Sequence, residues 1–529
     1  MLNTPTISAK QQNVVGLFVL LFGVFVAWQL GGWISNGDIT ILKYGAIAAV
    51  VGLIGSRILR DWRSGFYVFL TWLLFEDLIR KHLGNNMAIF FAKDVLALLV
   101  YISLIIAIRK REELVFRPTF MIPIALFFWF SVLQLFNPYS PSIFYGLLGM
   151  KLYFYYLPLM FVGYALIRND ADLRRLLMAS LVLSGVIGGL GIVQSIVGPD
   201  FLNPANLAPE LQPLGQLDKF TPITHQRLHL PASVFVSTGR YSQYLVLSFV
   251  IGLAAVGYFL LQPVKRRWMA LVSLGIVSVA VALCGSRGAV VLSLASAAVM
   301  AVAFLWGAPW RNQQVYRTMQ AIRRAVIVIA LCLGAAALAF PQLLGGRIDY
   351  YTETLLPSSS AFELQTRVWD YPIRNISYAF MEPHWVVGSG IGTVSLGTQY
   401  VARLINSEKP GNGVESGYGS IIVELGIVGL TLWLVWTISL MFSCWRATKT
   451  VRQTRFFPIA FGIFWFAFLL LFPQTYGSLN NYQDYVLNAY LWLMIGILFR
   501  LPDLLVSAPA ILPSPVVVAN RRLHALPSH

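Results

Sequence analysis

Two carboxylates stand where a glycine-rich stretch passes into an apolar run, in GNGVESGYGSIIVELGIVGL at 411–430. Glu415 precedes the run, where the dipole at a helix start stabilises a charged carboxylate. Such a carboxylate can accept a proton from a hydroxyl group. Alternatively, Glu415 is an acidic residue that only stabilises the helix start, with Ser416 as the cap. Glu424 lies within the apolar run, so we assign it a structural role with a backbone or basic partner. Gly426 is one of several glycines here that let neighbouring segments approach closely.

Four arginines have settings that suit an anion. Arg287 opens an apolar run in CGSRGAVV, where the free N–H groups of a helix start favour a phosphate. Arg240, in VSTGRYSQY, has a similar setting. Arg367 and Arg374 are two helical turns apart in QTRVWDYPIRN, so a helix would direct both the same way. The forked donors of a guanidinium suit a diphosphate. The alternative roles of these arginines are to snorkel to lipid headgroups or to form a solvated basic face.

Other polar features have more ordinary interpretations. His384, in MEPHWVVGSGIG, is a reserve candidate for the base, but such a histidine is more often a packed structural residue. The sequence GSGIG at 388–392 follows no strand, so it predicts a tight turn and not a nucleotide site. Three cysteines, Cys284, Cys332 and Cys444, share no spacing pattern, so we expect no disulfide framework and no metal site. We also expect no cofactor.

The elements that position these residues are membrane spans. Of the 529 residues, 57% are hydrophobic and 12% charged, with a mean hydropathy of +0.69, which identifies an integral membrane protein. Apolar stretches long enough to cross about 30 Å of hydrocarbon recur throughout, so we expect an all-α polytopic protein. Fourteen spans are predicted near 14–34, 41–60, 65–82, 86–108, 119–137, 143–167, 174–197, 238–262, 268–284, 288–308, 322–342, 416–445, 456–473 and 484–500.

Lysine and arginine concentrate in alternate loops, which predicts that these loops and both termini are cytoplasmic. The net charge of +17 is therefore mostly a topology signal, and no basic soluble face exists that would bind nucleic acid.

We expect helices 1–11 within 1–342, with a periplasmic segment at 198–237. A large periplasmic loop at 343–415 should form a partly helical cap, and helices 12–14 should occupy 416–502 before a cytoplasmic tail at 503–529. A second charged group should form ion pairs between spans three and four: Glu76, Asp77, Arg80, Lys81, Lys93 and Asp94.

Several of these stretches together resemble the O-antigen ligase and polysaccharide polymerase superfamily: GSRGA, R-x-W, GSGIG and ESGYGSIIVELGIVGL. FEDLIRKHL with AKDVL, and GMKLYFYYLPLMF at 149–161, look more like the exopolysaccharide polymerase branch. The resemblance covers most of the chain and is strongest from 280 to 430. It implies a GT-C-type helical bundle with a large periplasmic loop. It also implies glycan transfer from undecaprenyl diphosphate to an acceptor hydroxyl, with inversion and without a metal.

The resemblance places Arg287, Arg240 and Arg367 at the donor diphosphate. Ligases of this superfamily usually carry a histidine and an asparagine where this chain has Glu415 and Ser416, which favours a polymerase. We therefore expect a bacterial inner-membrane enzyme that polymerises undecaprenyl-diphosphate-linked oligosaccharides of an exopolysaccharide or O-antigen. The alternatives are a ligase with a lipid or protein acceptor and, from another class, a transporter of lipid-linked glycans. Expected partners are the lipid-linked donor, a glycan acceptor, membrane lipids and other polysaccharide export proteins.

Overall fold

The structure is a computed structural model that describes residues 55–85, 87–110, 113, 115–204, 211, 218–262, 267–309, 323, 341–360, 362–407 and 414–506. The chain divides into two compact units. The first contains Met1–Phe69 and Asp94–Ile106, and the second contains Leu70–Lys93 and Ala107–His529. Helices α3 (Trp62–His82) and α4 (Met87–Arg109) each contribute to both units.

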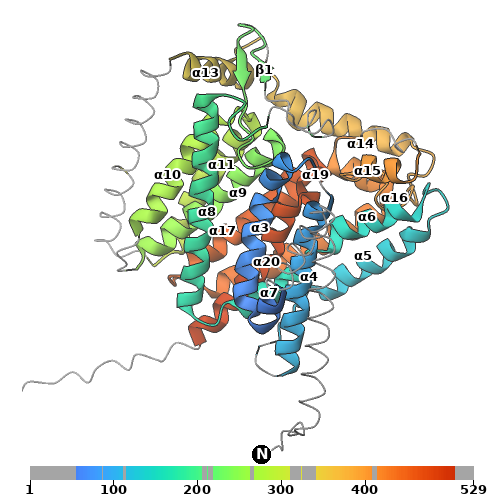
Figure 1. Ribbon diagram of the computed structural model, residues 1–529, viewed down its shortest axis with the longest axis vertical. Coiled ribbons are helices and arrows are strands. Elements are labelled where there is room, and N and C mark those ends of the chain that lie inside the picture. Colours follow the sequence, from blue (N-terminus) through green and yellow to red (C-terminus); the bar gives the residue numbers. More distant parts are fainter. Residues whose placement is uncertain are drawn as a thin grey trace, which may run out of the picture. The chain divides into compact units, whose positions relative to one another are not determined.

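The second unit is mostly helical (Figure 1). Its first half contains α5 (Met121–Leu133), η1 (Gln134–Phe136), α6 (Ile143–Phe154), α7 (Leu159–Leu166), α8 (Asp170–Val197), β1 (Asp218–Phe220), β2 (Arg227–His229), α9 (Thr238–Leu260), α10 (Arg267–Leu283) and α11 (Arg287–Gly307). Its second half contains α13 (Pro341–Leu355), η2 (Thr366–Asp370), α14 (Tyr371–Met381), α15 (Thr398–Leu404), α16 (Gly417–Thr450), α17 (Phe457–Leu469), η3 (Leu470–Gln474), α18 (Thr475–Gly477), α19 (Leu479–Gln483) and α20 (Tyr485–Val506).

Eight of the described helices are long and apolar enough to cross a membrane: Met87–Arg109, Ile143–Leu166, Asp170–Val197, Thr238–Leu260, Arg287–Gly307, Gly417–Thr450, Phe457–Gly477 and Tyr485–Leu505. Met121–Phe136 and Arg267–Leu283 are shorter apolar helices, and α3 covers the expected span 65–82 but is more charged. The expected spans 14–34 and 322–342, and residues 41–54 of the expected span 41–60, lie wholly or almost wholly outside the described residues. Length and composition therefore indicate a multi-pass helical membrane protein.

Close helix packing depends on glycine, as between α7 and α20. A Cβ atom on Gly163 would lie 2.1 Å from the carbonyl oxygen of Leu493. A Cβ atom on Gly496 would lie 1.9 Å from the carbonyl oxygen of Met160. Each helix therefore presents a glycine to the backbone of the other, which is how small residues allow membrane helices to approach.

The segments before α9 and after α11 contain structure of their own. Strands β1 and β2 pair antiparallel with Lys219 opposite Leu228, and this short hairpin was not predicted from the sequence. Arg347 of α13 donates to the carbonyl oxygens of Leu283, at 2.7 Å, and His229, at 2.9 Å. Figure 1 shows α13 and β1 together at one end of helices α8 to α11. The expected cap at 343–415 is partly helical, with α13, η2, α14 and α15.

The predicted span 416–445 is not one continuous helix, because α16 breaks at Gly426, where φ is 70° and ψ is −176°. The freed backbone groups pair with the turn that leads into GSGIG and with the first residues of GSGIG itself. Ile427 N–H donates to the Trp385 carbonyl at 2.9 Å, and Ser389 N–H donates to the Val423 carbonyl at 2.8 Å. A loop far away in sequence thus completes the hydrogen bonding of a membrane helix.

We predict that Gly426→Ala lowers the free energy of unfolding by about 1–3 kcal/mol, because an L side chain is strained at this positive φ. Its Cβ would also lie 2.1 Å from the carbonyl oxygen of Val386. Thermal unfolding in detergent measures the effect. Gly189→Ala is the control, since a Cβ there meets nothing within 4 Å. Equal unfolding midpoints for the two variants would contradict this account.

Candidate functional site

Arg287 is the first residue of α11, and a tight turn at Gly285, with φ 66°, places it there. One guanidinium nitrogen, Nη1, lies 2.8 Å from Glu363 Oε2. The guanidinium also lies over the ring of Tyr350, 5.3 Å from its centroid. Its side chain is 20% exposed, so the charge is partly shielded from water but remains accessible.

Arg367 shares the same carboxylate. Its Nε lies 3.5 Å from Glu363 Oε2, and its side chain is 58% exposed. Its guanidinium lies 5.6 Å from the ring centroid of Tyr371. Arg287 and Arg367, which the sequence analysis placed at one anion site, therefore meet at Glu363.

Lys219 of strand β1 is a third cation at this place. Its pKa is lowered by partial burial and then by the positive charges of Arg287 and Arg367. Its side chain is still exposed, so we attribute the shift to its surroundings and not to full enclosure. We call Lys219, Arg287 and Arg367 the cationic cluster. Three positive charges with one carboxylate, Glu363, leave an excess of positive charge that can attract an anion.

Glu415 is exposed and precedes α16 by two residues. Its backbone N–H donates to Asn375 Oδ1 at 3.1 Å. A hydrogen bond from the Tyr371 hydroxyl to the Glu415 carboxylate raises the pKa of Tyr371. Ser416 does not cap the helix with its side chain, because its hydroxyl donates to the Tyr476 carbonyl at 3.0 Å. Ser416 is the N-cap residue of α16, as expected, but it caps the helix without a side-chain hydrogen bond.

Tyr371 links the carboxylate to the cations. It contacts Arg367 through its ring and Glu415 through its hydroxyl. The sequence analysis singled out neither Tyr371 nor Glu363, although both lie beside the Arg367 motif. The arrangement joins a solvent-exposed carboxylate to a positively charged patch, which are the two parts that a transfer from a phosphorylated donor requires.

Arg240 lies elsewhere. It forms ion pairs with Asp77, at 2.5 Å, and Asp484, at 2.6 Å, and it donates to the Tyr485 hydroxyl at 3.2 Å. Its side chain is only 14% exposed. Arg240 is therefore tied into a buried ion-pair network and does not join Arg287 and Arg367.

The charged group expected on α3 and α4 does form ion pairs. Within the second unit, Arg80 lies 2.8 Å from Asp77 and 3.7 Å from Glu76. Lys93 lies 3.3 Å from Glu76. This part of the interpretation is confirmed, and Asp94 belongs to the other compact unit.

The same network holds the chain between the hairpin and α9. Asp77 accepts from the N–H of Val236 at 3.2 Å, and Lys81 donates to the Ser233 carbonyl at 3.1 Å. Gln194 also accepts from the N–H of Ser233, at 2.7 Å. These buried bonds fix one end of the segment that carries Lys219.

Arg374 is exposed on α14 and forms no ion pair with any residue that the structure describes. His384 is partly buried, and its ring stacks on Tyr139 with 3.6 Å between the centroids. This is the packed environment that is typical of a structural histidine.

Glu424 is fully buried and accepts three hydrogen bonds: from Tyr153 at 3.0 Å, from Ser395 at 2.6 Å and from the N–H of Val394 at 3.1 Å. The expected backbone partner is therefore present. Among the described residues no basic side chain pairs with it. Two residues further along the chain, Gly426 forms the break in α16.

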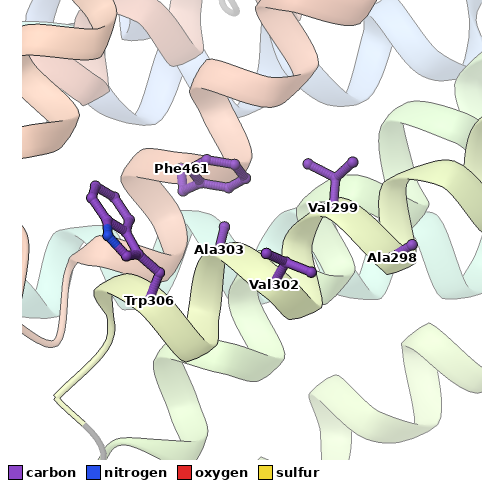
Figure 2. Close-up of a pocket in the computed structure, with 6 residues that line it drawn as sticks. All are labelled: Ala298, Val299, Val302, Ala303, Trp306 and Phe461. Carbon is purple, nitrogen blue, oxygen red and sulfur yellow. The ribbon is translucent and has the colours of Figure 1, made fainter.

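An apolar pocket of about 430 Å³ lies elsewhere, between α11 and α17 (Figure 2). Its lining consists of Ala298, Val299, Val302, Ala303, Trp306 and Phe461. None of these side chains titrates, so the pocket offers no acid, base or anion-binding group. In the described ranges no group of three or more histidine, cysteine or acidic side chains could hold a metal ion.

The chain matches no model of a known protein family and no curated protein. Its function must therefore be argued from the geometry of the site and from the motifs.

We predict that Asp77→Asn destabilises the protein by about 3–5 kcal/mol, because it leaves a buried arginine only partly compensated. The matched control is Asp218→Asn, whose partner Arg227 is 69% exposed. A surface pair of this kind contributes about 0–1 kcal/mol. Unfolding midpoints of the two variants in detergent would show the difference. Equal losses of stability in Asp77→Asn and Asp218→Asn would contradict a structural role for the network.

We also predict that pyrophosphate binds at the cationic cluster and that its affinity falls as pH rises. The protonated amine of Lys219 attracts the anion. Because its pKa is lowered, this amine loses its proton at a lower pH than an ordinary lysine, whose pKa is about 10.4. Calorimetric titration of the detergent-solubilised protein measures the affinity at each pH. Lys219→Arg should remain charged and keep its affinity over the same range. Identical pH profiles would remove Lys219 from the site.

Proposed function

We propose that this protein is a membrane glycosyltransferase that polymerises undecaprenyl-diphosphate-linked oligosaccharide repeat units of an exopolysaccharide or O-antigen. It would act on the periplasmic face of the bacterial inner membrane. The observation that carries the proposal is the connection of Glu415 to Arg287 and Arg367 through Tyr371 and Glu363. The resemblance of the motifs supplies the substrate class.

In this proposal, the cationic cluster binds the diphosphate of the donor. The anion would compete with Glu363 for Arg287 and Arg367. As the bond between the anomeric carbon and the diphosphate oxygen breaks, negative charge develops on that oxygen. Fixed guanidinium groups stabilise such charge without reorganising, which is the usual source of a large rate gain.

Glu415 would take the proton of the acceptor hydroxyl as its oxygen attacks the anomeric carbon from the opposite face. One carbon–oxygen bond forms, the bond to the diphosphate breaks, and the lipid diphosphate leaves with both electrons. This single displacement inverts the anomeric centre. Tyr371 and Asn375 would orient Glu415, through its carboxylate and its backbone N–H respectively.

The positions of these residues favour an enzyme over a transporter. Arg287 is the first residue of α11, Glu415 precedes α16, and Lys219 lies in the hairpin. A transporter is expected to hold its functional charges near the middle of its spans.

The test is product size after incubation of the purified protein, with chelator, with lipid-linked repeat units as the only glycan. Wild-type protein should give longer lipid-linked chains. Glu415→Gln should lower the rate roughly 10²–10⁴-fold, because the base is lost. Arg287→Ala should lower the rate roughly 10²–10³-fold, because charge stabilisation is lost.

Glu382→Gln is the control. Glu382 directly follows α14, the helix that contacts Glu415, and does not itself contact the described residues of the site. It should keep wild-type activity. Full activity of Glu415→Gln would exclude Glu415 as the base. If the wild-type protein consumed the lipid-linked units only after a separate acceptor was added, that result would favour a ligase.

A further inference from the structure

A strip of large apolar side chains is exposed at the end of α14 and in the turn that follows. Its members and their exposed fractions are Phe380 (41%), Met381 (74%), Trp385 (38%), Val386 (46%) and Val387 (46%). We call these five residues the apolar strip. The ring of Phe380 contacts that of Trp385, with 5.5 Å between the centroids, which joins the two parts of the strip. The opposite side of α14 is already covered, because Ala379 packs on Ile422 and Val423.

The hydrogen bonds to α16 fix the depth of this strip. With 34 residues, α16 would be about 51 Å long if it were straight, well beyond about 30 Å of hydrocarbon. The part after Gly426, Ile427–Thr450, is about 36 Å long and can span the hydrocarbon by itself. Ile427 N–H donates to the Trp385 carbonyl at 2.9 Å. The strip therefore lies level with the first residue of the spanning part.

Helix α5 gives the same depth independently. Gln134 donates to the Val387 carbonyl at 2.8 Å, and Asn137 donates to the Gly388 carbonyl at 3.0 Å. The apolar helix Met121–Phe136 ends beside these residues. Its last turn exposes Leu133 and Phe136, at 71% and 72%. The helix that meets the strip at this level thus also exposes large apolar side chains there.

We propose that the apolar strip is immersed in the boundary between the headgroups and the acyl chains of the bilayer, so that the end of α14 is an in-plane membrane anchor. Its contacts with α16 and with the apolar helix Met121–Phe136 place it at this depth. Its side chains are apolar, and it includes a tryptophan, a residue that is enriched at such interfaces. Helix α14 also carries Tyr371 and Asn375, the contacts of Glu415. The lipid surface would therefore fix the height of the candidate site above the membrane.

The test uses spin labels on the full-length protein in nanodiscs of phosphatidylethanolamine and phosphatidylglycerol. The three native cysteines are replaced by alanine, and single cysteines are introduced by Val386→Cys, Met381→Cys and Ser358→Cys. Ser358 is an exposed polar residue in the turn after α13 and serves as the control. Collision rates with oxygen, which dissolves in lipid, are compared with those of a water-soluble nickel chelate.

The labels at 386 and 381 should collide more often with oxygen than with the chelate, and the label at 358 should show the reverse. Two positions in the strip keep the test decisive if one variant does not fold. Preferential collision with the chelate at both would place the strip in water and overturn the proposal. Shielding from both reagents would mean that a second copy of the chain covers the strip, which would overturn it equally.

Discussion

A helix that breaks where it is buried must find new partners for its freed backbone groups, because an unpaired buried N–H or carbonyl group is costly. In α16 the break at Gly426 meets this requirement with one turn of the chain, which pairs with Val423, Glu424 and Ile427. The pairing fixes the turn to α16 and, through Gln134, to α5. The start of α16, which carries Glu415, and helix α14, which contacts it, are positioned by this same junction.

Charge balance separates the two arginine clusters of the protein. Arg240 is buried between Asp77 and Asp484, and Asp77 also pairs with Arg80, so Arg240 acts as a structural tie. Arg287 and Arg367 share a single carboxylate, Glu363, and Lys219 adds a further charge. The same residue type therefore serves structure where its guanidinium is buried between two carboxylates, and it remains available to a ligand where it shares one carboxylate and stays partly exposed. The proposed site follows from this difference in neutralisation.

The sequence predicted features that depend on nearby residues. Apolar length predicted the helices that are long and apolar enough to cross a membrane. The charged residues of α3 and α4 were expected to form ion pairs, as Arg80 does with Asp77 and Glu76. It could not predict that Arg240 meets Asp484, which is 244 positions away, because that contact depends on how α9 and α20 pack. Lys219 was missed for the same reason, since a short hairpin between spans brings it to Arg287. The break at Gly426 was missed because the turn that stabilises it is outside any local window.

The central claim is that the donor diphosphate binds between Arg287 and Arg367 with Glu415 at the reacting carbon. The most direct measurement is a cryo-electron microscopy structure of the protein with an undecaprenyl-diphosphate-linked repeat unit. The account predicts diphosphate density within hydrogen-bonding distance of both guanidinium groups, with Glu363 displaced from Arg287 and the first sugar next to Glu415. Density for the diphosphate at any other place, with the ion pair between Arg287 and Glu363 intact, would contradict it.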